Sequence, residues 1–325
     1  MKLLRRRFLH LAAGAAALPA MARIARAETY PAKPVRIVVG VPAGGPIDIS
    51  ARLIGQWLSE RLGQQFIIDN RPGAGGNIGT EAVVRAPADG YTLLLAYASS
   101  AINATLFDKL NYEFIRDIAP IATINRIPLV LESHPSFPVK TVSELITFAK
   151  ANPAKVNMAS PGNGTAPHVA GELFNMMAGV NIVHVPYRGS GPMLTDLLGG
   201  QVQVAFDGLS SSIEHVRADR LRALAVATTT RLEALPDILT VGDSVPGFEA
   251  SGWCGVGAPR NTSIEIVDKL NKEINAGLAD PKIKARLADL GTTPFMGTPS
   301  DFGRFIAAET AKWAKVVKFA GLKPE

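Results

Sequence analysis

Four short loops in this sequence combine glycine with hydroxyl, amide or charged side chains, and each follows a run of residues typical of a strand. They span residues 41–48, 70–80, 160–168 and 185–192, and a shorter segment, Phe-Asp-Gly at 206–208, ends another such run. Glycine lets the backbone approach a ligand closely, and the unpaired N–H groups at the start of a following helix attract anions. The pattern therefore predicts loops that could hold a small anion.

Each candidate side chain in these loops has a binding role and a structural alternative. Asp48 could receive a ligand amine or hydroxyl, or cap the helix that follows it. Arg188 could clamp a carboxylate through two hydrogen bonds, or lie solvated at the surface. His168 either contacts the ligand or serves the structure, and Tyr187 could form an aromatic wall. The candidates for ligand binding are Pro42, Ala43, Gly44, Gly45, Asp48, Ser99, Ser160, Asn163, Gly164, Thr165, His168, Tyr187, Arg188 and Asp207.

The loop at 70–80, NRPGAGGNIGT, raises the question of a nucleotide site. Counted from Gly73, the sixth residue is Ile78, so the register of G-x-G-x-x-G fails, and no lysine follows a terminal glycine as a Walker A loop requires. The segment from Gly73 to Gly79 either shapes a cleft or forms a tight turn between a strand and a helix. No cofactor is expected.

Signals for catalysis and for metal binding are weak. The sequence has no G-x-S-x-G and no H-E-x-x-H motif, and the four histidines beyond residue 27 lack metal-ligand spacing. A serine–histidine pair such as Ser160 or Ser99 with His168 could assemble in space, but no feature favours it. Cys254 is the only cysteine, which excludes an intramolecular disulfide, and it is interpreted as a small buried hydrophobe rather than a reactive thiol. We therefore expect neither an enzyme nor a metal site.

The first 27 residues resemble an export signal. They contain six basic and no acidic residues, a short apolar segment and the small-x-small sequence Ala-Arg-Ala. RRRFLH also fits the twin-arginine pattern, and the sequence does not decide between that route and general secretion. Removing these six from the 34 basic residues leaves 28 against 28 acidic ones, so the formal charge of +6 belongs to the leader. Nucleic-acid binding loses its support, and a soluble periplasmic protein is expected.

The elements that must position the loops alternate between strand and helix. Runs such as 35–39, 66–69 and 91–96 are typical of buried strands, and 49–62 has the spacing of an amphipathic helix. A second series of this kind follows, and amphipathic helices end the chain. The order predicts an α/β protein of two lobes, 28–128 with 253–325 and 129–252. The chain would cross between them near 124–135 and 250–258, which makes a hinge with a ligand cleft between the lobes.

These loops resemble those of the Bug proteins, the extracytoplasmic solute receptors of tripartite tricarboxylate transporters. One departure is Cys254, where many relatives carry an aromatic residue between Trp253 and Gly255. The matching segments follow one another along nearly the whole chain beyond the leader: VPAGGPIDISAR, NRPGAGGNIGTEAVVRAPADGYTLLLA, ASPGNGTAPHVAGELF, VHVPYRGSGPMLTDLLGGQVQVAFD and GAPRNTSIEIVDKLNKEI.

The resemblance implies a two-lobe periplasmic-binding-protein fold, type II-like, that closes on a small carboxylated ligand. It also implies ligand contacts from the loop at 42–48, largely through backbone and water, and from 160–168, 187–189 and Asp207. The expected ligand is a dicarboxylate, a tricarboxylate, an amino acid or an aromatic acid. The expected partners are membrane transporter subunits or a sensor kinase, and the receptor is expected to be a monomer. An exported hydrolase is the remaining alternative.

Overall fold

The structure, a computed structural model, describes residues 30–324. The chain divides into two compact units, Met1–Ala32 and Lys33–Glu325, and all described helices and strands belong to the second. The export signal predicted for residues 1–27 lies outside the described residues. No helix within residues 30–324 combines the length and apolar character needed to cross a membrane.

Two sheets of the second unit share one long strand, β4 (Ile118–Ser133). The first sheet has the order β2-β1-β3-β9-β4, with β10 also paired to β4, and the second has the order β6-β5-β7-β4-β8. Strands β1 to β3 are mutually parallel, as are β5 to β7, whereas β4 and β9 run antiparallel to their neighbours. The other strands are β1 (Val35–Val39), β2 (Phe66–Asn70), β3 (Thr92–Tyr97), β5 (Asn157–Ser160), β6 (Val183–Pro186), β7 (Val204–Gly208), β8 (Arg222–Val226), β9 (Ser251–Pro259) and β10 (Thr293–Pro294).

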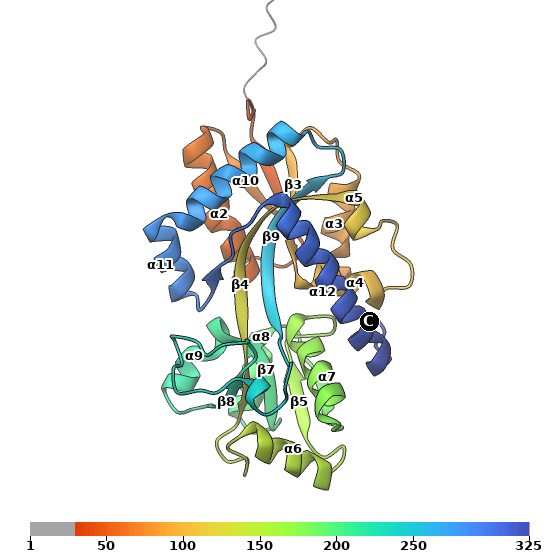
Figure 1. The fold of residues 1–325 in the computed structure, drawn as a ribbon, viewed down its shortest axis with the longest axis vertical. Coiled ribbons are helices and arrows are strands. Elements are labelled where there is room, and N and C mark those ends of the chain that lie inside the picture. The colour runs from red at the N-terminus through yellow and green to blue at the C-terminus, as the bar shows by residue number, and fades with distance from the viewer. Residues whose placement is uncertain (1–29, 325) are drawn as a thin grey trace, which may run out of the picture. The chain divides into compact units, whose positions relative to one another are not determined.

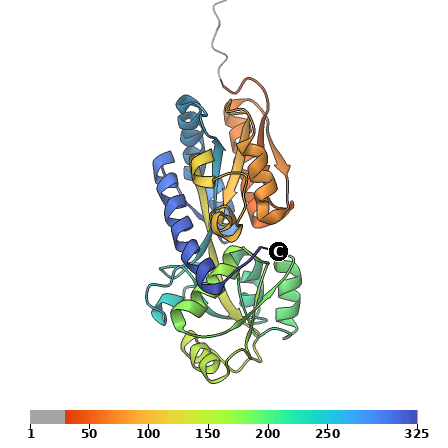
Figure 2. The same cartoon turned by 90° about the vertical axis from the view of Figure 1, so that its right-hand side faces the viewer.

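Helices cover both sheets and complete two lobes. In Figure 1 the lobes lie one above the other and are joined by β4 and β9. The longest helix, α12 (Pro299–Ala320), packs against α4 (Ala98–Leu106) of the first lobe and against α7 (Ala166–Ala178) of the second. Figure 2 shows α12 running along the upper lobe and ending against the top of the lower one. The other α-helices are α2 (Pro46–Leu62), α3 (Asn77–Val84), α5 (Phe114–Asp117), α6 (Val142–Ala151), α8 (Ser190–Leu198), α9 (Leu209–Arg217), α10 (Ile264–Ala279) and α11 (Pro281–Asp289), with short 3₁₀ turns at Ala74–Gly76 and Val241–Asp243.

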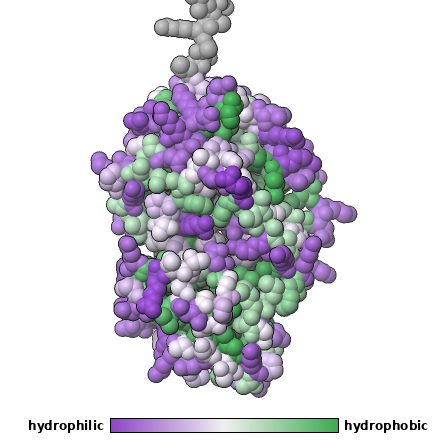
Figure 3. All heavy atoms as spheres, viewed as in Figure 1, coloured by the Kyte–Doolittle hydropathy of each residue, from purple (hydrophilic) through white to green (hydrophobic). Residues whose placement is uncertain are grey.

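Local sequence explains several of these boundaries. Helix α2 ends at Gly63, whose left-handed φ of 71° suits glycine. Thr165 caps α7 by accepting a hydrogen bond from the backbone N–H of His168, and Thr298 caps α12 with Asp301 in a capping box. Buried strands and amphipathic helices separate a large apolar core from a surface on which hydrophilic and hydrophobic side chains are interspersed, as Figure 3 shows for one face.

The predicted two-lobe α/β fold is confirmed, with corrections. From its apolar pattern the sequence predicts two separate strands at 118–125 and 129–132, but these residues belong to one continuous strand, β4. The sequence prediction also missed α4, α9 and β9. Strand β9 reads SGWCGVGAP and is buried along its whole length, so it shows no alternation of polar and apolar residues. Strands β4 and β9 pass through both predicted crossing segments. The lobe boundaries stay a prediction.

A cluster of aromatic and charged side chains joins β9 to α12. The indole N–H groups of Trp253 and Trp313 both donate to Glu309 Oε2, at 3.2 and 2.9 Å, and Lys312 pairs with Glu309 Oε1 at 2.6 Å. Cys254, next to Trp253, is fully buried, and burial raises the pKa of its thiol to about 12. The interpretation of Cys254 as a buried hydrophobe fits this position.

Replacing Gly255 with alanine should destabilise the fold. An added Cβ would lie 2.3 Å from Phe302 of α12 and 2.8 Å from the carbonyl oxygen of Ala122 on β4. Overpacking of this kind typically costs about 1–3 kcal/mol, which urea denaturation would measure. Gly191→Ala is the matched control, because no atom lies within 4 Å of its added Cβ and its site is helical. Equal stability of the two variants would contradict the packing assigned to Gly255.

Candidate functional site

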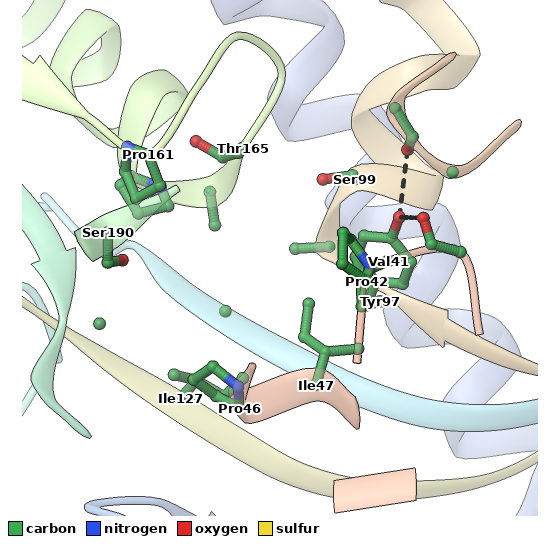
Figure 4. A pocket seen from close by; sticks show the side chains of 18 of the residues that line it. Val41, Pro42, Pro46, Ile47, Tyr97, Ser99, Ile127, Pro161, Thr165 and Ser190 are labelled. Atoms are coloured by element: carbon green, nitrogen blue, oxygen red, sulfur yellow. Dashed lines mark hydrogen bonds between the residues drawn. The ribbon is translucent and has the colours of Figure 1, made fainter. Parts of the chain in front are cut away.

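A cavity of about 610 Å³ lies where the lobes meet along β4 and β9. Ile127 and Leu129 of β4, with Gly252 and Trp253 of β9, line it from the connecting strands. The rest of the lining comes from loops at the carboxyl ends of strands in both lobes. Figure 4 shows Val41, Tyr97 and Ser99 of one lobe and Pro161, Thr165 and Ser190 of the other around this cavity. It occupies the position at which α/β sheets commonly bind ligands.

Helices from both lobes begin at the cavity. The first N–H groups of a helix have no partner within the helix, and the helix dipole places partial positive charge there. Such helix starts favour an anion through partial charges alone, in addition to any charged side chain nearby. The lining residues at these helix starts are Pro46 and Ile47 of α2, Gly76 before α3, Ala98 and Ser99 of α4, Ala166 and Pro167 of α7, Ser190 of α8, and Gly208 and Ser211 of α9.

Much of the lining is apolar. Val41 and Ile47 come from the first lobe, Pro161 from the second, and Ile127 and Trp253 from the connecting strands. Apolar walls with a few polar groups are typical of small-molecule sites. The cavity is therefore chemically suited to a ligand with an apolar carbon chain and one or more anionic groups.

Asp48 braces the first-lobe loop instead of capping α2. The helix N-cap is Gly45, and Asp48 lies in the first turn with 1% of its surface exposed. Its Oδ2 accepts from the backbone N–H of Gly44 and from Arg52 Nε, both at 2.8 Å, and its Oδ1 accepts from Asn70 Nδ2 at 2.9 Å. Burial alone would raise the pKa of this carboxyl, but these hydrogen bonds hold it below its usual value.

Tyr97 supports the glycine-rich loop at 73–76. Its hydroxyl, drawn with dashed lines in Figure 4, lies 3.1 Å from the carbonyl oxygen of Gly75 and 3.4 Å from that of Gly40, and its single hydrogen can be donated to either. A Cβ on Gly76 would lie 2.0 Å from that hydroxyl, and the φ of Gly76 is 94°. Gly73, Gly75 and Gly76 line the cavity, so here the glycine loop both makes a tight turn and shapes the cleft.

One hydrogen bond crosses the cavity from lobe to lobe. Ser99 Oγ, at the start of α4, donates to the carbonyl oxygen of Gly164 at 2.9 Å. Gly164 adopts a φ of 70°, and an added Cβ would lie 2.7 Å from Leu106 of α4. The loop before α7 therefore packs closely on the first lobe at this point.

A histidine pair braces the second-lobe loop. The rings of His168 and His184 stack with centroids 3.7 Å apart, and His168 Nδ1 accepts from the backbone N–H of Gly164 at 3.1 Å. Ser160 Oγ lies 2.6 Å from His184 Nε2, so the histidine that Ser160 contacts is His184 and not His168. Ser160 is 1% exposed and does not line the cavity. Burial lowers the pKa of His168 to about 3, with a contribution from His184, and the pKa of His184 to about 4.

The loop after β6 and the end of β7 bring charged groups to the same wall. Arg188 lines the cavity and makes no ion pair with the described residues, whereas the Tyr187 hydroxyl donates to Asp196 at 2.8 Å and lies outside the lining. Asp207 is 1% exposed and accepts from Ser190 Oγ at 2.8 Å. Desolvation raises the pKa of Asp207 to about 6, although its hydrogen bonds act in the opposite direction.

The structure thus divides the predicted residues into two groups. Those that line the cavity are Pro42, Ser99, Asn163, Thr165, Arg188 and Asp207. Those that lie outside the lining are Ala43, Gly44, Gly45, Asp48, Ser160, Gly164, His168 and Tyr187. Several of the second group hold the lining loops in place, and ligand contact by residues of either group stays a prediction.

Several lining residues were missed by sequence reasoning. Gly40 and Tyr97 stand at strand ends, where the rule that ligands bind there could have found them, and Val41 and Ser190 lie in predicted loops but were not chosen as candidates. Trp253 had no such signal, because β9 carries no recognisable strand pattern. Among the described residues, no group of three or more histidine, cysteine, aspartate or glutamate side chains is placed to hold a metal ion.

Comparison with known proteins matches almost the whole chain to one family. The family model described as tripartite tricarboxylate transporter family receptor matches residues 50–322. Protein BugT of Bordetella pertussis is 38% identical over 300 residues, which are 91% of this chain and 92% of that protein. The structure of R. palustris Rpa4515 with adipate has 39% identity and a TM-score of 0.82, covering 91% of this chain and 100% of that one. MatC from Rhodopseudomonas palustris with bound malate has 31% identity and a TM-score of 0.79, covering 89% and 100%.

The histidine pair should make the protein less stable in acid. Between pH 6.5 and about 3 the unfolded chain binds protons at these imidazoles that the folded chain does not. The free energy of unfolding therefore falls as pH is lowered through that window and is fully restored above it. Urea denaturation across this range should show that the free energy of unfolding depends less steeply on pH in His184→Phe than in the unaltered chain. The difference in slope should correspond to at most one bound proton. Identical slopes would show that the pair does not titrate in this way.

Proposed function

The chain belongs to the tripartite tricarboxylate transporter receptor family, and on that premise we propose that it captures a small carboxylate in the cavity and presents it to a membrane transporter. The observation that carries this proposal is the set of helix N-termini from both lobes around one largely apolar cavity. Partial positive charges on these N–H groups stabilise a carboxylate. The apolar walls provide contact for its carbon chain.

The relatives support a carboxylate of modest size. Rpa4515 has been solved with adipate and MatC with malate, and both cover nearly the same length of chain as this protein. Both ligands carry two carboxyl groups. Arg188 adds a full positive charge at the second-lobe wall, where a charge-assisted hydrogen bond to a carboxylate is about twice as strong as a neutral one. We place the receptor in the periplasm, where a leader such as residues 1–27 would deliver it.

Capture would proceed by closure of the lobes about β4 and β9. Only contacts that exist in the closed form shift the equilibrium toward it. We infer that the bond from Ser99 to the Gly164 carbonyl is such a contact, because it joins the two lobes at the rim of the cavity. A ligand that touches helix starts in both lobes adds further closed-state contacts. The transporter would then distinguish the closed form from the open one.

Binding should be measurable by calorimetry on the chain that begins at Glu28, with adipate, malate, amino acids and aromatic acids as ligands. Arg188→Gln should weaken the best carboxylate by about 10- to 100-fold, since it removes a charge-assisted hydrogen bond worth about 1.5–3 kcal/mol. Arg217→Gln is the control, because Arg217 is another exposed second-lobe arginine that pairs with Glu214 and does not line the cavity. Equal losses in both variants, or no binding by any carboxylate, would count against the proposal.

The contact across the lobes should affect dissociation more than association. Ser99→Ala removes one hydrogen bond of the closed form, so we expect the dissociation rate to rise about 2- to 10-fold with little change in the association rate. Stopped-flow measurements with the ligand found by calorimetry would separate the two rates. Thr105→Ala, on the same helix but outside the lining, is the matched control. A change confined to the association rate would argue against Ser99 as a closing contact.

A further inference from the structure

Two buried carboxyl groups share one serine hydroxyl at the second-lobe end of the cavity. Glu132 on β4 has no exposed surface, and Asp207 at the end of β7 is 1% exposed. Val130 is the β4 partner of Asp207, so Glu132 stands two residues further along the same face of the sheet. Ser212 of α9 reaches both acids, with its Oγ 2.9 Å from Glu132 Oε1 and 3.2 Å from Asp207 Oδ2.

The number of hydrogens available decides the charge of this group. A hydroxyl has one hydrogen, so Ser212 can donate to only one of the two carboxyl groups. The other contact also joins two oxygens, and it is a full hydrogen bond only if the carboxyl group supplies the hydrogen. Two ionised carboxylates this close in a dry interior would repel each other as well. The arrangement therefore holds one acid proton.

The distribution of donors places that proton on Glu132. Asp207 also accepts hydrogen bonds from Ser190, from the side chain of Ser211 and from the backbone N–H of Gly208. Glu132 Oε2 accepts no hydrogen bond from the described residues. An ionised Glu132 would thus leave a buried charge unsatisfied, whereas an ionised Asp207 is well supported. Burial, and secondarily Asp207, raises the pKa of Glu132 well above its ordinary value.

The other charged groups on neighbouring elements do not neutralise Glu132. On β8, Arg222 donates to three backbone carbonyls, and on α9 Glu214 pairs with Arg217. His215, also on α9, has its pKa lowered by burial and by Arg220. Arg188 is exposed at the wall of the cavity. None of these forms an ion pair with Glu132 in the described part of the chain.

The state of this acid pair determines what the cavity wall offers to a ligand. Ser190 and Ser211 line the cavity, and both give their hydroxyl hydrogens to the ionised Asp207. Their oxygens then have only lone pairs left for a ligand. We propose that Glu132, by keeping the proton, makes this wall an acceptor surface that selects carboxylates which also carry a hydrogen-bond donor, such as a hydroxyl or ammonium group. The selection rests on the receptor function proposed above.

Ligand selection can be tested with matched pairs of acids at about pH 7.5. Calorimetry would compare succinate with malate and hexanoate with 6-hydroxyhexanoate, which place the hydroxyl near to or far from a carboxylate. The hydroxylated member of at least one pair should bind about three- to tenfold more tightly. In Asp207→Asn the side-chain amide can donate to one of the serine hydroxyls, which then has its own hydrogen free for a ligand. The advantage of the hydroxylated acid should therefore disappear, and the ratio of its affinity to that of the plain acid should fall to one or below. Ser190→Ala, a milder change, should reduce the ratio.

The proton itself can be tested without a ligand. Infrared spectroscopy of the full chain at about pH 7.5 should show the C=O stretch of a neutral carboxyl group, since free carboxyl groups are ionised there. The band should vanish in Glu132→Gln and persist in Glu172→Gln, a change at another carboxyl whose pKa burial raises. A chain without the band, or a band that survives Glu132→Gln, would overturn the assignment of the proton.

The calorimetry also separates the selection inference from the receptor function. If the plain acid binds as well as its hydroxylated partner in both pairs, the selection inference is wrong while the receptor function stands. If no carboxylate binds at all, the receptor function fails and the selection inference falls with it. Circular dichroism of Asp207→Asn and Glu132→Gln would show whether each variant is folded. If either one is not, the affinity ratio measured with Ser190→Ala still tests the selection inference.

Discussion

The hydrogen bonding of β4 on both sides is the constraint on which the rest of the structure depends. Its first part pairs with β9 in one sheet, and its last part pairs with β7 and β8 in the other. Backbone hydrogen bonds along a buried strand are costly to break, because the freed groups would have no water to replace the partner. The strand therefore keeps the two sheets together while its middle, at Ile127 and Leu129, lines the cavity. Further along the same strand, Glu132 forms the acid pair with Asp207.

The cavity handles charge mainly through helix dipoles and, on the proposal above, through the proton kept by Glu132. Helix starts place partial positive charge around a space with few ionised side chains, so an anion can be held without a large desolvation cost for buried cations. Asp207 would be unfavourable beside a carboxylate if it acted alone. Its hydrogen bonds from Ser190 and Ser212 compensate that charge locally. Glu132 adds no second negative charge, because its Oε2 has no hydrogen-bond donor among the described residues to support one.

A second layer of side chains gives the lining loops their shape. Asp48 ties the loop before α2 to β2 through Asn70, Tyr97 spans two glycine carbonyls, and His168 holds the loop before α7. None of these needs to touch a ligand to matter for binding. Loops that are already ordered lose less conformational entropy when a ligand arrives, so more of the interaction energy remains for affinity. Closure can then be a movement of lobes about two strands and not a rearrangement of each loop.

Sequence alone determined the fold class, most of the loops that line the cavity, and the family resemblance. The strand-and-helix order and glycine-rich strand ends are local features, and local hydrogen bonding and burial control them. It could not predict β9, because a glycine-rich strand buried on both faces has neither alternation nor propensity to reveal it. It could not separate Thr165, which lines the cavity, from His168 three residues later, which braces it, because side-chain direction depends on packing against β6 and α4. Tertiary structure alone brought Glu132 to Asp207, since residues 75 positions apart meet only when β4 and β7 pair.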